Sequence, residues 1–299
     1  MKLKPQQVVK IYEYSNMKLH SFVGNYFFVS PFLVNGLPKA GTNLLTKAVS
    51  LFPGIRSTSV HLSRATLANF KPSHPEQTTD MLPIGIDWPQ NVSCEAVKQA
   101  LNQLKKGSYA TGHICYSDTL SELLTALGMK SVLILRDPRD VVVSHAFYVA
   151  KNPKHFLYEY YQELSNDDRI TKSMVGVEQV SATDPLLLNI DERFRIVLPW
   201  ISATHNYTTY FEKLVGGSGG GSRQNQIDEL NNIAQHLGIY CNSSAIAQNA
   251  DKLFGGTVTF RRGNIGGWRN HYSSKHKQIF KDVAGQLLID LGYEQNFDW

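Results

Sequence analysis

The sequence predicts an α/β fold, a three-layer sandwich around a central and mostly parallel sheet. Two observations support this prediction. Apolar runs of strand length alternate with segments of helical period along the chain. A glycine-bearing loop, Leu37–Asn43, joins the first of these strands to a helix, as in a P-loop-like phosphate-binding loop. With 299 residues, of which 42% are hydrophobic, the chain can bury a large core, and we expect a single domain over residues 1–299.

The elements are expected in a regular order. Strands are predicted at Phe32–Asn35, Ser108–Ile114, Lys130–Leu135 and Tyr207–Phe211. Helices are predicted at Leu44–Val49, Asp118–Leu127, from Asp137–Asp140 onward, and at Gln224–Leu237. Pro138 suits a first helical turn, and Gly238 is a typical helix stop. Two segments without clear period, 71–92 and 151–191, are expected to be irregular lids or acceptor-binding segments.

Composition excludes several classes of protein. The net charge is +5 without a block of five or more Lys or Arg residues, which favours an anionic ligand over nucleic acid. The three cysteines lie far apart, which indicates a reducing compartment. The start of the chain lacks the pattern of a signal peptide, and the most apolar stretch, Phe22–Val34, is too short and interrupted to span a bilayer. We expect a cytoplasmic protein without membrane attachment, and the oligomeric state is not predicted.

The loop Leu37–Asn43 is the strongest single motif. Backbone N–H groups at a helix N-terminus point toward a bound anion, and the helix dipole favours negative charge there. Gly36 and Gly41 have the spacing of the nucleotide-triphosphate loop G-x-x-x-x-G-K-[ST]. In that motif, however, the lysine directly follows the second glycine, whereas Lys39 precedes Gly41 by two positions. A lysine in the middle of the loop indicates a different phosphate chemistry.

Two further motifs offer cations for a second phosphate. Arg136 stands at the end of a predicted strand and Ser144 two turns into the following helix, so that a guanidinium and a hydroxyl could hold one phosphate from two sides. The alternative is an ion pair of Arg136 with Asp137 or Asp140. Later, paired arginines precede a glycine-rich stretch within residues 260–272, which allows close backbone approach to a ligand. The alternative there is an ordinary basic surface loop.

His113 ends the predicted strand Ser108–Ile114. In open α/β sheets ligands bind just beyond the carboxyl ends of the strands, which makes this histidine a candidate catalytic group. A purely structural histidine is the alternative.

The order of these motifs resembles that of the PAPS-dependent sulfotransferases, where PAPS is 3′-phosphoadenosine 5′-phosphosulfate. The matching motifs span residues 35 to 272: the loop, a strand-end histidine, Arg-x7-Ser, and Arg-Arg-Gly-x-x-Gly-x-Trp. The resemblance implies the sulfotransferase fold, with PAPS as co-substrate and no metal. The segment from Phe211 to Arg223 is also similar to bacterial members, including cyanobacterial enzymes that act on natural products.

The resemblance also implies roles for particular residues. The family's loop binds the 5′-phosphosulfate, which here falls on Lys39, Ala40, Gly41, Thr42 and Asn43. The 3′-phosphate site falls on Arg136, Ser144, Arg261, Arg262 and Gly263, and a segment that helps to bind adenine falls on Phe211. Leu44 stands where members often place a tryptophan against the adenine. The short dimerisation motif of animal cytosolic members is not evident.

Sulfuryl transfer is an in-line displacement in which charge builds on the bridging oxygen of the departing phosphate. Lys39 is the candidate to stabilise that charge, and His113 is the candidate base for the acceptor hydroxyl. We see no carboxylate cluster suited to magnesium. Two alternatives stay open: a nucleotide-dependent kinase with Asp137 as metal ligand, and a non-catalytic module that binds PAPS or another nucleotide.

The acceptor is expected to be a small molecule, sulfated on a hydroxyl or a nitrogen. Aromatic residues in the two irregular segments suit a flat or apolar acceptor: Trp88, Phe156, Tyr158, Tyr160 and Tyr161. Asp167, Asp168 and Glu178 instead suit a cationic acceptor, such as a guanidinium toxin. The run Gly216–Ser222 resembles a synthetic linker in composition, but its continuous flanks favour a natural flexible connector.

Overall fold

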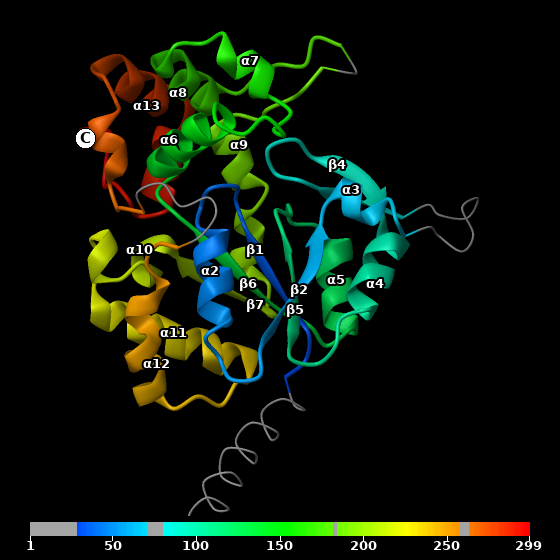
Figure 1. Ribbon diagram of the computed structural model, residues 1–299. Coiled ribbons are helices and arrows are strands. Elements are labelled where there is room, and N and C mark those ends of the chain that lie inside the picture. Colours follow the sequence, from blue (N-terminus) through cyan, green and yellow to red (C-terminus); the bar gives the residue numbers. More distant parts are fainter. Residues whose placement is uncertain (1–28, 71–79, 182–183, 257–262) are drawn as a thin grey trace, which may run out of the picture.

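The computed structural model describes residues 29–70, 80–181, 184–256 and 263–299. At its centre lies a five-stranded sheet in the order β2-β5-β1-β6-β7, in which every neighbouring pair is parallel (Figure 1). The strands are β1 (Phe32–Gly36), β2 (Arg56–Leu62), β5 (Ser108–Gly112), β6 (Lys130–Leu135) and β7 (Asn206–Tyr210). The four predicted strands are therefore confirmed within two residues at each end, and β2 was not predicted.

Alternation along the strands places a hydrophobic core on each face of the sheet. In β1, Phe32 and Val34 point to one core while Leu33 points to the other. In β6, the residues Val132 and Ile134 likewise point to the first core, and the leucines at 133 and 135 point to the second. The first core is covered by α2 (Thr42–Val49), α10 (Phe211–Leu214), α11 (Arg223–Leu237) and α12 (Ser243–Ala250). The second is covered on its far side by α3 (Arg64–Leu67), α4 (Cys94–Asn102) and α5 (Asp118–Ala126). The three-layer prediction is confirmed.

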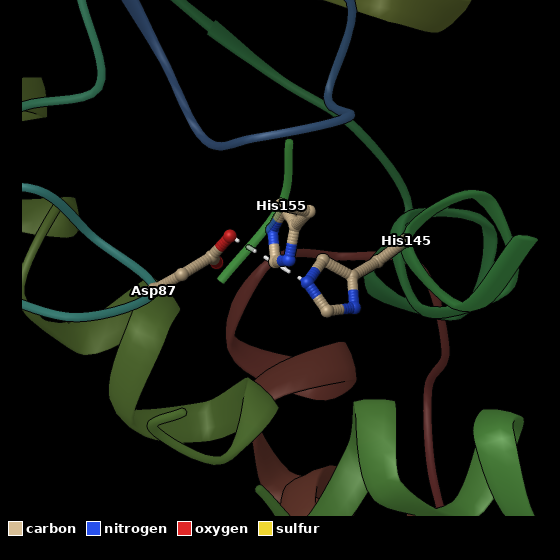
Figure 2. Close-up of side chains that lie close together, drawn as sticks. All are labelled: Asp87, His145 and His155. Carbon is tan, nitrogen blue, oxygen red and sulfur yellow. Dashed lines mark ion pairs between the residues drawn. The ribbon is translucent and has the colours of Figure 1, made fainter. Parts of the chain in front are cut away.

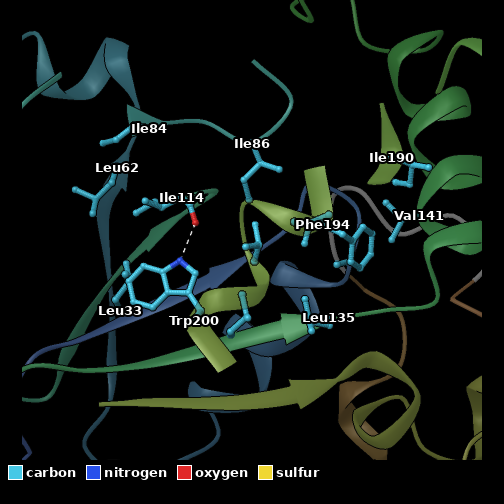
Figure 3. Packing of buried hydrophobic residues seen from close by; sticks show 14 of the residues in the cluster. Leu33, Leu62, Ile84, Ile86, Ile114, Leu135, Val141, Ile190, Phe194 and Trp200 are labelled. Carbon is cyan, nitrogen blue, oxygen red and sulfur yellow. Dashed lines mark hydrogen bonds between the residues drawn. The ribbon is translucent and has the colours of Figure 1, made fainter. Parts of the chain in front are cut away.

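A further group of helices gathers around the carboxyl ends of the strands (Figure 1). It consists of α6 (Pro138–Val149), α7 (Tyr158–Gln162), α8 (Asn166–Val175), α9 (Ile190–Arg195) and α13 (Ser274–Asp290). Trp200, in a short 3₁₀ turn after α9, is fully buried in the second core and donates a hydrogen bond from Nε1 to the Ile114 carbonyl at 3.2 Å (Figure 3). Among the described residues we find no helix with the length and hydrophobicity that crossing a membrane requires.

The two segments predicted to be irregular contain several short helices and strands, so the prediction holds for only part of their length; residues 71–79 of the first lie outside the described residues. The first contains an antiparallel pair, β3 (Met81–Ile84) and β4 (Gln90–Ser93), and the second contains α7, α8 and the start of α9. Each of these elements is short, and Pro83 interrupts the strand pattern of β3. Short helices depend on packing rather than on local propensity, which explains why the sequence pattern did not reveal them.

Candidate active site

The carboxyl ends of four adjacent strands bring the predicted site residues together. The loop Leu37–Asn43 follows β1, His113 follows β5, Arg136 follows β6 and Phe211 follows β7. Since β5 and β6 flank β1 on opposite sides, the chain leaves β1 at a point where the strand order reverses, which is the place where α/β folds bind ligands. A cavity of about 420 Å³ opens there. Its wall includes these predicted residues: Lys39, Gly41, Thr42, Asn43, His113, Arg136, Ser144, Phe211 and Gly263.

The loop before α2 is tightly constrained by its surroundings. A Cβ atom at Gly36 would lie 2.7 Å from Ile134 Cγ2, and one at Gly41 would lie 2.8 Å from Phe211 Cδ2. Gly41 is the N-cap of α2 with a φ of 114°, and no side chain caps the helix. The N-terminus of α2 lies at the cavity, and no side chain caps its first-turn N–H groups. Uncapped N–H groups at a helix N-terminus are the arrangement that binds anions.

Lys39 holds the left-handed backbone conformation that the loop needs. Its φ is 71°, and among the residues that the structure describes it is the non-glycine residue with positive φ. That conformation costs roughly 1–2 kcal/mol for a residue with a Cβ. The Lys39 ammonium lies 3.8 Å from the centre of the Tyr148 ring, at the cavity wall. The loop thus accepts backbone strain at the position that carries its cation.

Ala40 and Thr42 have different environments within the same loop. Ala40 is fully buried in the core and donates its N–H to the Leu37 carbonyl at 3.0 Å, so neither its side chain nor its N–H is presented to a ligand. Ala40 therefore shapes the loop and is not proposed to contact the phosphate. Thr42 Oγ1, in contrast, is buried without a hydrogen-bond partner. A buried hydroxyl beside a helix N-terminus can donate a hydrogen bond to a phosphate oxygen.

Arg136 makes the ion pair considered from the sequence and also lines the cavity together with Ser144. Its Nη2 donates to the Asn264 carbonyl at 2.9 Å and lies 3.4 Å from Asp140 Oδ2, so the predicted ion pair exists. Its Nε is buried without a partner, and Ser144 lies on the same cavity wall. The guanidinium lies 4.0 Å from the centre of the Phe211 ring. Phe211 is only 5% exposed and packs against Gly41, so it supports Arg136 and offers little surface to an adenine.

Asp140, which the sequence analysis did not assign to the site, holds the late glycine-rich motif in place. It accepts hydrogen bonds from the backbone N–H groups of Gly266, at 2.9 Å, and Trp268, at 2.8 Å. Burial raises the pKa of the Asp140 carboxyl, and the nearby Arg136 charge opposes that rise. Gly263 lines the cavity, while Arg261 and Arg262 lie outside the described residues.

The run Gly216–Ser222 packs beneath the late motif. Gly219 is buried and accepts a hydrogen bond from the Ile265 N–H at 3.0 Å. A Cβ atom at Gly219 would lie 2.2 Å from Val215 Cγ2 and 2.7 Å from the Gly263 carbonyl oxygen. The expectation of a flexible connector is therefore wrong, because the run is a folded turn with internal hydrogen bonds.

His113 is oriented by its ring nitrogen Nδ1, which lies 2.6 Å from the Gly36 carbonyl oxygen. A carbonyl only accepts, so Nδ1 carries the proton and Nε2 has the free lone pair in the neutral ring. Burial lowers the pKa of His113, partly opposed by the hydrogen bond to Gly36 and the Asp87 charge, while the Lys39 charge adds to the lowering. A neutral imidazole with an unprotonated Nε2 is the form required of a general base.

Asn35 makes this arrangement rigid and was not predicted. Its side chain is fully buried, donates to the Ile114 carbonyl at 2.9 Å and accepts the N–H groups of Gly36 and Ile114 at 2.9 Å each. The His113 carbonyl in turn accepts the Gly85 N–H at 3.1 Å. The backbone on both sides of His113 is thus fixed to the end of β1.

A second polar cluster in the cavity wall consists of Asp87, His145 and His155 (Figure 2). Asp87 is buried; burial would raise its pKa, but His145 and Arg193 outweigh that effect and hold it below the usual range. Burial lowers the pKa of His145, and it lowers that of His155 to about 4. The three residues are 58 and 10 positions apart in sequence, a spacing that carries no recognisable metal or catalytic motif.

The two predicted acceptor segments meet at the cavity, although not through the residues expected. Trp88 packs on Phe156 with ring centres 5.4 Å apart, and Phe156 stacks on His155 at 4.4 Å. The cavity wall includes Asp87 and His155 but none of the five aromatic residues named above. The acidic residues considered for a cationic acceptor are exposed and do not line the described cavity: Asp167, Asp168 and Glu178.

Comparison with known proteins gives one family and several similar folds. The model of the sulfotransferase domain matches residues 30–211, more than half of the chain. A search of curated protein sequences found none that is significantly similar to this chain.

Solved structures share the fold at low sequence identity. A mouse sulfotransferase, SULT7A1, in complex with PAP is 16% identical over 93% of both chains, with a TM-score of 0.55. A retinol dehydratase with androsterone and inactive cofactor PAP is 14% identical over 89% of this chain and 84% of its own, with a TM-score of 0.52. A second complex of a retinol dehydratase, with retinol and PAP, is 14% identical over 92% and 86%, with a TM-score of 0.51.

Proposed function

Because the chain belongs to the sulfotransferase family, we propose that it transfers a sulfuryl group from PAPS to a small-molecule acceptor and releases PAP. The observation that carries this proposal is the single cavity in which two separate anion-binding walls meet a neutral histidine. The solved structures named above contain PAP, and at their low sequence identities they support a common fold.

Each wall suits one phosphate group of the nucleotide. Lys39, Gly41, Thr42 and Asn43 at the N-terminus of α2 are proposed to bind the 5′-phosphosulfate, and Thr42 Oγ1 supplies a buried hydroxyl there. Arg136, Ser144 and Gly263 are proposed to bind the 3′-phosphate on the other wall. Arg261 and Arg262 are proposed for the same phosphate on the family motif alone.

The chemistry follows from these positions. The acceptor oxygen or nitrogen attacks sulfur while the bond from sulfur to the bridging oxygen breaks, and PAP departs with the electron pair. His113 Nε2 takes the acceptor proton, because Nδ1 is committed to Gly36. The Lys39 ammonium and the N–H groups of the loop stabilise the charge that develops on the departing phosphate. No step of this mechanism uses a metal ion.

The cavity lining outside the residues proposed for the two phosphates is largely polar, and we propose it as the acceptor half. It includes His145, Tyr148, His155 and Asn270, which favour an acceptor with several hydrogen-bonding groups over a purely apolar one. The Asp87 charge is already matched by Arg193, whose Nη1 donates to Oδ1 at 3.1 Å. The cavity therefore gives no preference for a guanidinium over a neutral acceptor, and we propose a small polar natural product sulfated on a hydroxyl or a nitrogen.

The decisive experiment measures transfer of radiolabelled sulfate from PAPS to mixed small-molecule acceptors, together with PAP binding by calorimetry. A sulfotransferase gives a labelled product and binds PAP. A non-catalytic module binds PAP without any product, and a kinase transfers phosphate from a nucleoside triphosphate instead. His113→Asn is the matched negative control for product formation.

Arg136→Ala is expected to raise the KM for PAPS and the Kd for PAP by about 10- to 100-fold, because it removes charge-assisted hydrogen bonds to a phosphate. The KM for the acceptor should change little. Arg136→Lys keeps the charge but loses the forked geometry of the guanidinium. Its KM for PAPS and Kd for PAP should lie between those of the unaltered chain and of Arg136→Ala. Thermal unfolding controls for the loss of the Asp140 ion pair. Unchanged PAP binding by calorimetry would refute the assignment of the 3′-phosphate.

The pH profile should report the lowered pKa of His113. The neutral ring is the active form, so kcat/KM is expected to stay constant through neutrality and to fall only as the pH drops through a value below 6.5. The charged and titratable groups around this ring are Asp87, Lys39 and His61, whose own pKa is lowered to about 4. The measurement is kcat/KM for the acceptor against pH. An acid limb at or above pH 6.5 contradicts the prediction.

A further inference from the structure

The cluster Asp87, His145 and His155 brings three potential metal ligands to one point of the cavity wall. They come from the loop after β3, from α6 and from the segment before α7. One ligand atom from each lies within 4.8 Å of the others, and the side chains point toward one another (Figure 2). Together they offer one carboxylate oxygen and two imidazole nitrogens, a donor set that suits divalent transition metals.

Outer hydrogen bonds orient two of these side chains. Arg193 occupies Asp87 Oδ1 and also donates to the Ser173 carbonyl, which leaves Oδ2 directed at the cluster. Ser173 Oγ lies 2.9 Å from His145 Nδ1 and 3.0 Å from the Tyr161 hydroxyl. A hydroxyl on the second ring nitrogen is a common support for a histidine ligand. The ligand atoms Asp87 Oδ2 and His145 Nε2 therefore face each other because their other atoms are engaged.

His145 Nε2 is a buried nitrogen that a metal ion could use as a ligand. The side chain is only 1% exposed, and Nε2 is buried without a hydrogen-bond partner. It lies 3.6 Å from Asp87 Oδ2, a distance that allows an ion pair if the ring is protonated but is too long for a hydrogen bond. Two ligand atoms of a tetrahedral zinc ion lie about 3.3 Å apart, given bonds of about 2.0 Å. The separation is close to what a shared metal ion requires.

We propose that Asp87, His145 and His155 bind a divalent transition metal ion of the zinc class, with an open coordination position toward the acceptor half of the cavity. His155 completes the site by a movement of its ring. Its Nδ1 now accepts the Leu157 N–H at 3.2 Å. Binding through Nε2 puts the proton on Nδ1 and gives up that hydrogen bond, a loss that is small beside the free energy of metal binding. The ion would position the acceptor through one of its polar groups without taking part in the sulfuryl transfer, a role that rests on the proposed function.

Cobalt titration tests the site without any sulfuryl transfer. Protein dialysed against a chelator is titrated with Co²⁺, and the visible absorption of tetrahedral cobalt is recorded, followed by displacement with Zn²⁺. We expect saturation at one ion per chain. His145→Ala and His155→Ala should each weaken cobalt binding at least about 10-fold. His271→Ala removes an imidazole from the same cavity but outside the cluster, and should bind cobalt like the unaltered chain.

The outcomes separate cleanly. His155 is only partly buried, so its variant is expected to fold, and circular dichroism of each metal-free variant verifies this. Absence of saturable cobalt binding overturns the proposal, as does binding that both cluster variants leave unchanged. Because the titration needs neither PAPS nor an acceptor, its failure leaves the proposed sulfuryl transfer unaffected, and failure of the transfer assay leaves the metal result intact.

Discussion

Replacing His113 with alanine is expected to lower kcat for sulfuryl transfer by at least about 100-fold, the range usual for loss of a general base. The reason is the fixed tautomer of the ring: Nδ1 donates to the Gly36 carbonyl, and Nε2 is the atom left to accept a proton. Single-turnover rates with saturating PAPS measure the effect on chemistry rather than on product release.

His113→Asn is the sharper variant of the same experiment. The asparagine amide can still donate to the Gly36 carbonyl, so the loop is retained, but the side chain cannot take a proton at neutral pH. Both variants should bind PAP like the unaltered chain. If His113→Asn keeps normal turnover, the ring serves the loop structurally and another group is the base.

Lys39→Met is the second substitution with a large expected effect, a loss of about 100- to 1000-fold in kcat, comparable to removal of a donor that stabilises transition-state charge. Methionine has similar length, so packing against the Tyr148 ring is largely preserved while the ammonium is removed. Since charge grows on the bridging oxygen during the reaction, the loss should appear more in kcat than in the Kd for PAP. Rates and calorimetry on the same preparation provide both values.

Lys39→Arg controls for charge, and Lys39→Gly controls for the backbone. Glycine relieves the strain of a φ of 71° and should not lower the thermal unfolding temperature, although it removes the cation. We expect Lys39→Gly to be folded and nearly inactive, and Lys39→Arg to retain partial activity. A fully active Lys39→Gly enzyme would show that the loop N–H groups are sufficient for the leaving phosphate.

The sheet and the main walls of the site were predictable because both depend on local pattern. β6 was predicted at its observed bounds since five successive apolar or small residues are buried on both faces. Parallel strands end at one edge, so Lys39, His113 and Arg136 had to meet once the strands were recognised. The resemblance to a family then supplied the roles.

The supporting residues could not be predicted, because their partners are distant in sequence. From the sequence, Asn35 is only a weak strand residue, and its hydrogen bonds to Ile114 appear only in the structure. Asp140 likewise is only a helix residue in the sequence, and the structure shows that it accepts the N–H groups of Gly266 and Trp268. Asp87 faces His145 only because the first segment without a clear period, 71–92, packs against α6. In each case a long-range contact decides the role of the residue, and local propensity carries no signal of it.

The folded glycine turn Gly216–Ser222 has a practical consequence for anyone who engineers this protein. Its composition invites its use as a place to insert a tag, a reporter or a second domain, because such runs usually tolerate insertions. Here the absence of a side chain at Gly219 is what lets the turn fit between Val215 and the Gly263 carbonyl. An insertion beside Gly219 would disturb its contacts with Val215 and with the late motif at Gly263 and Ile265, so fusion partners belong elsewhere on the chain.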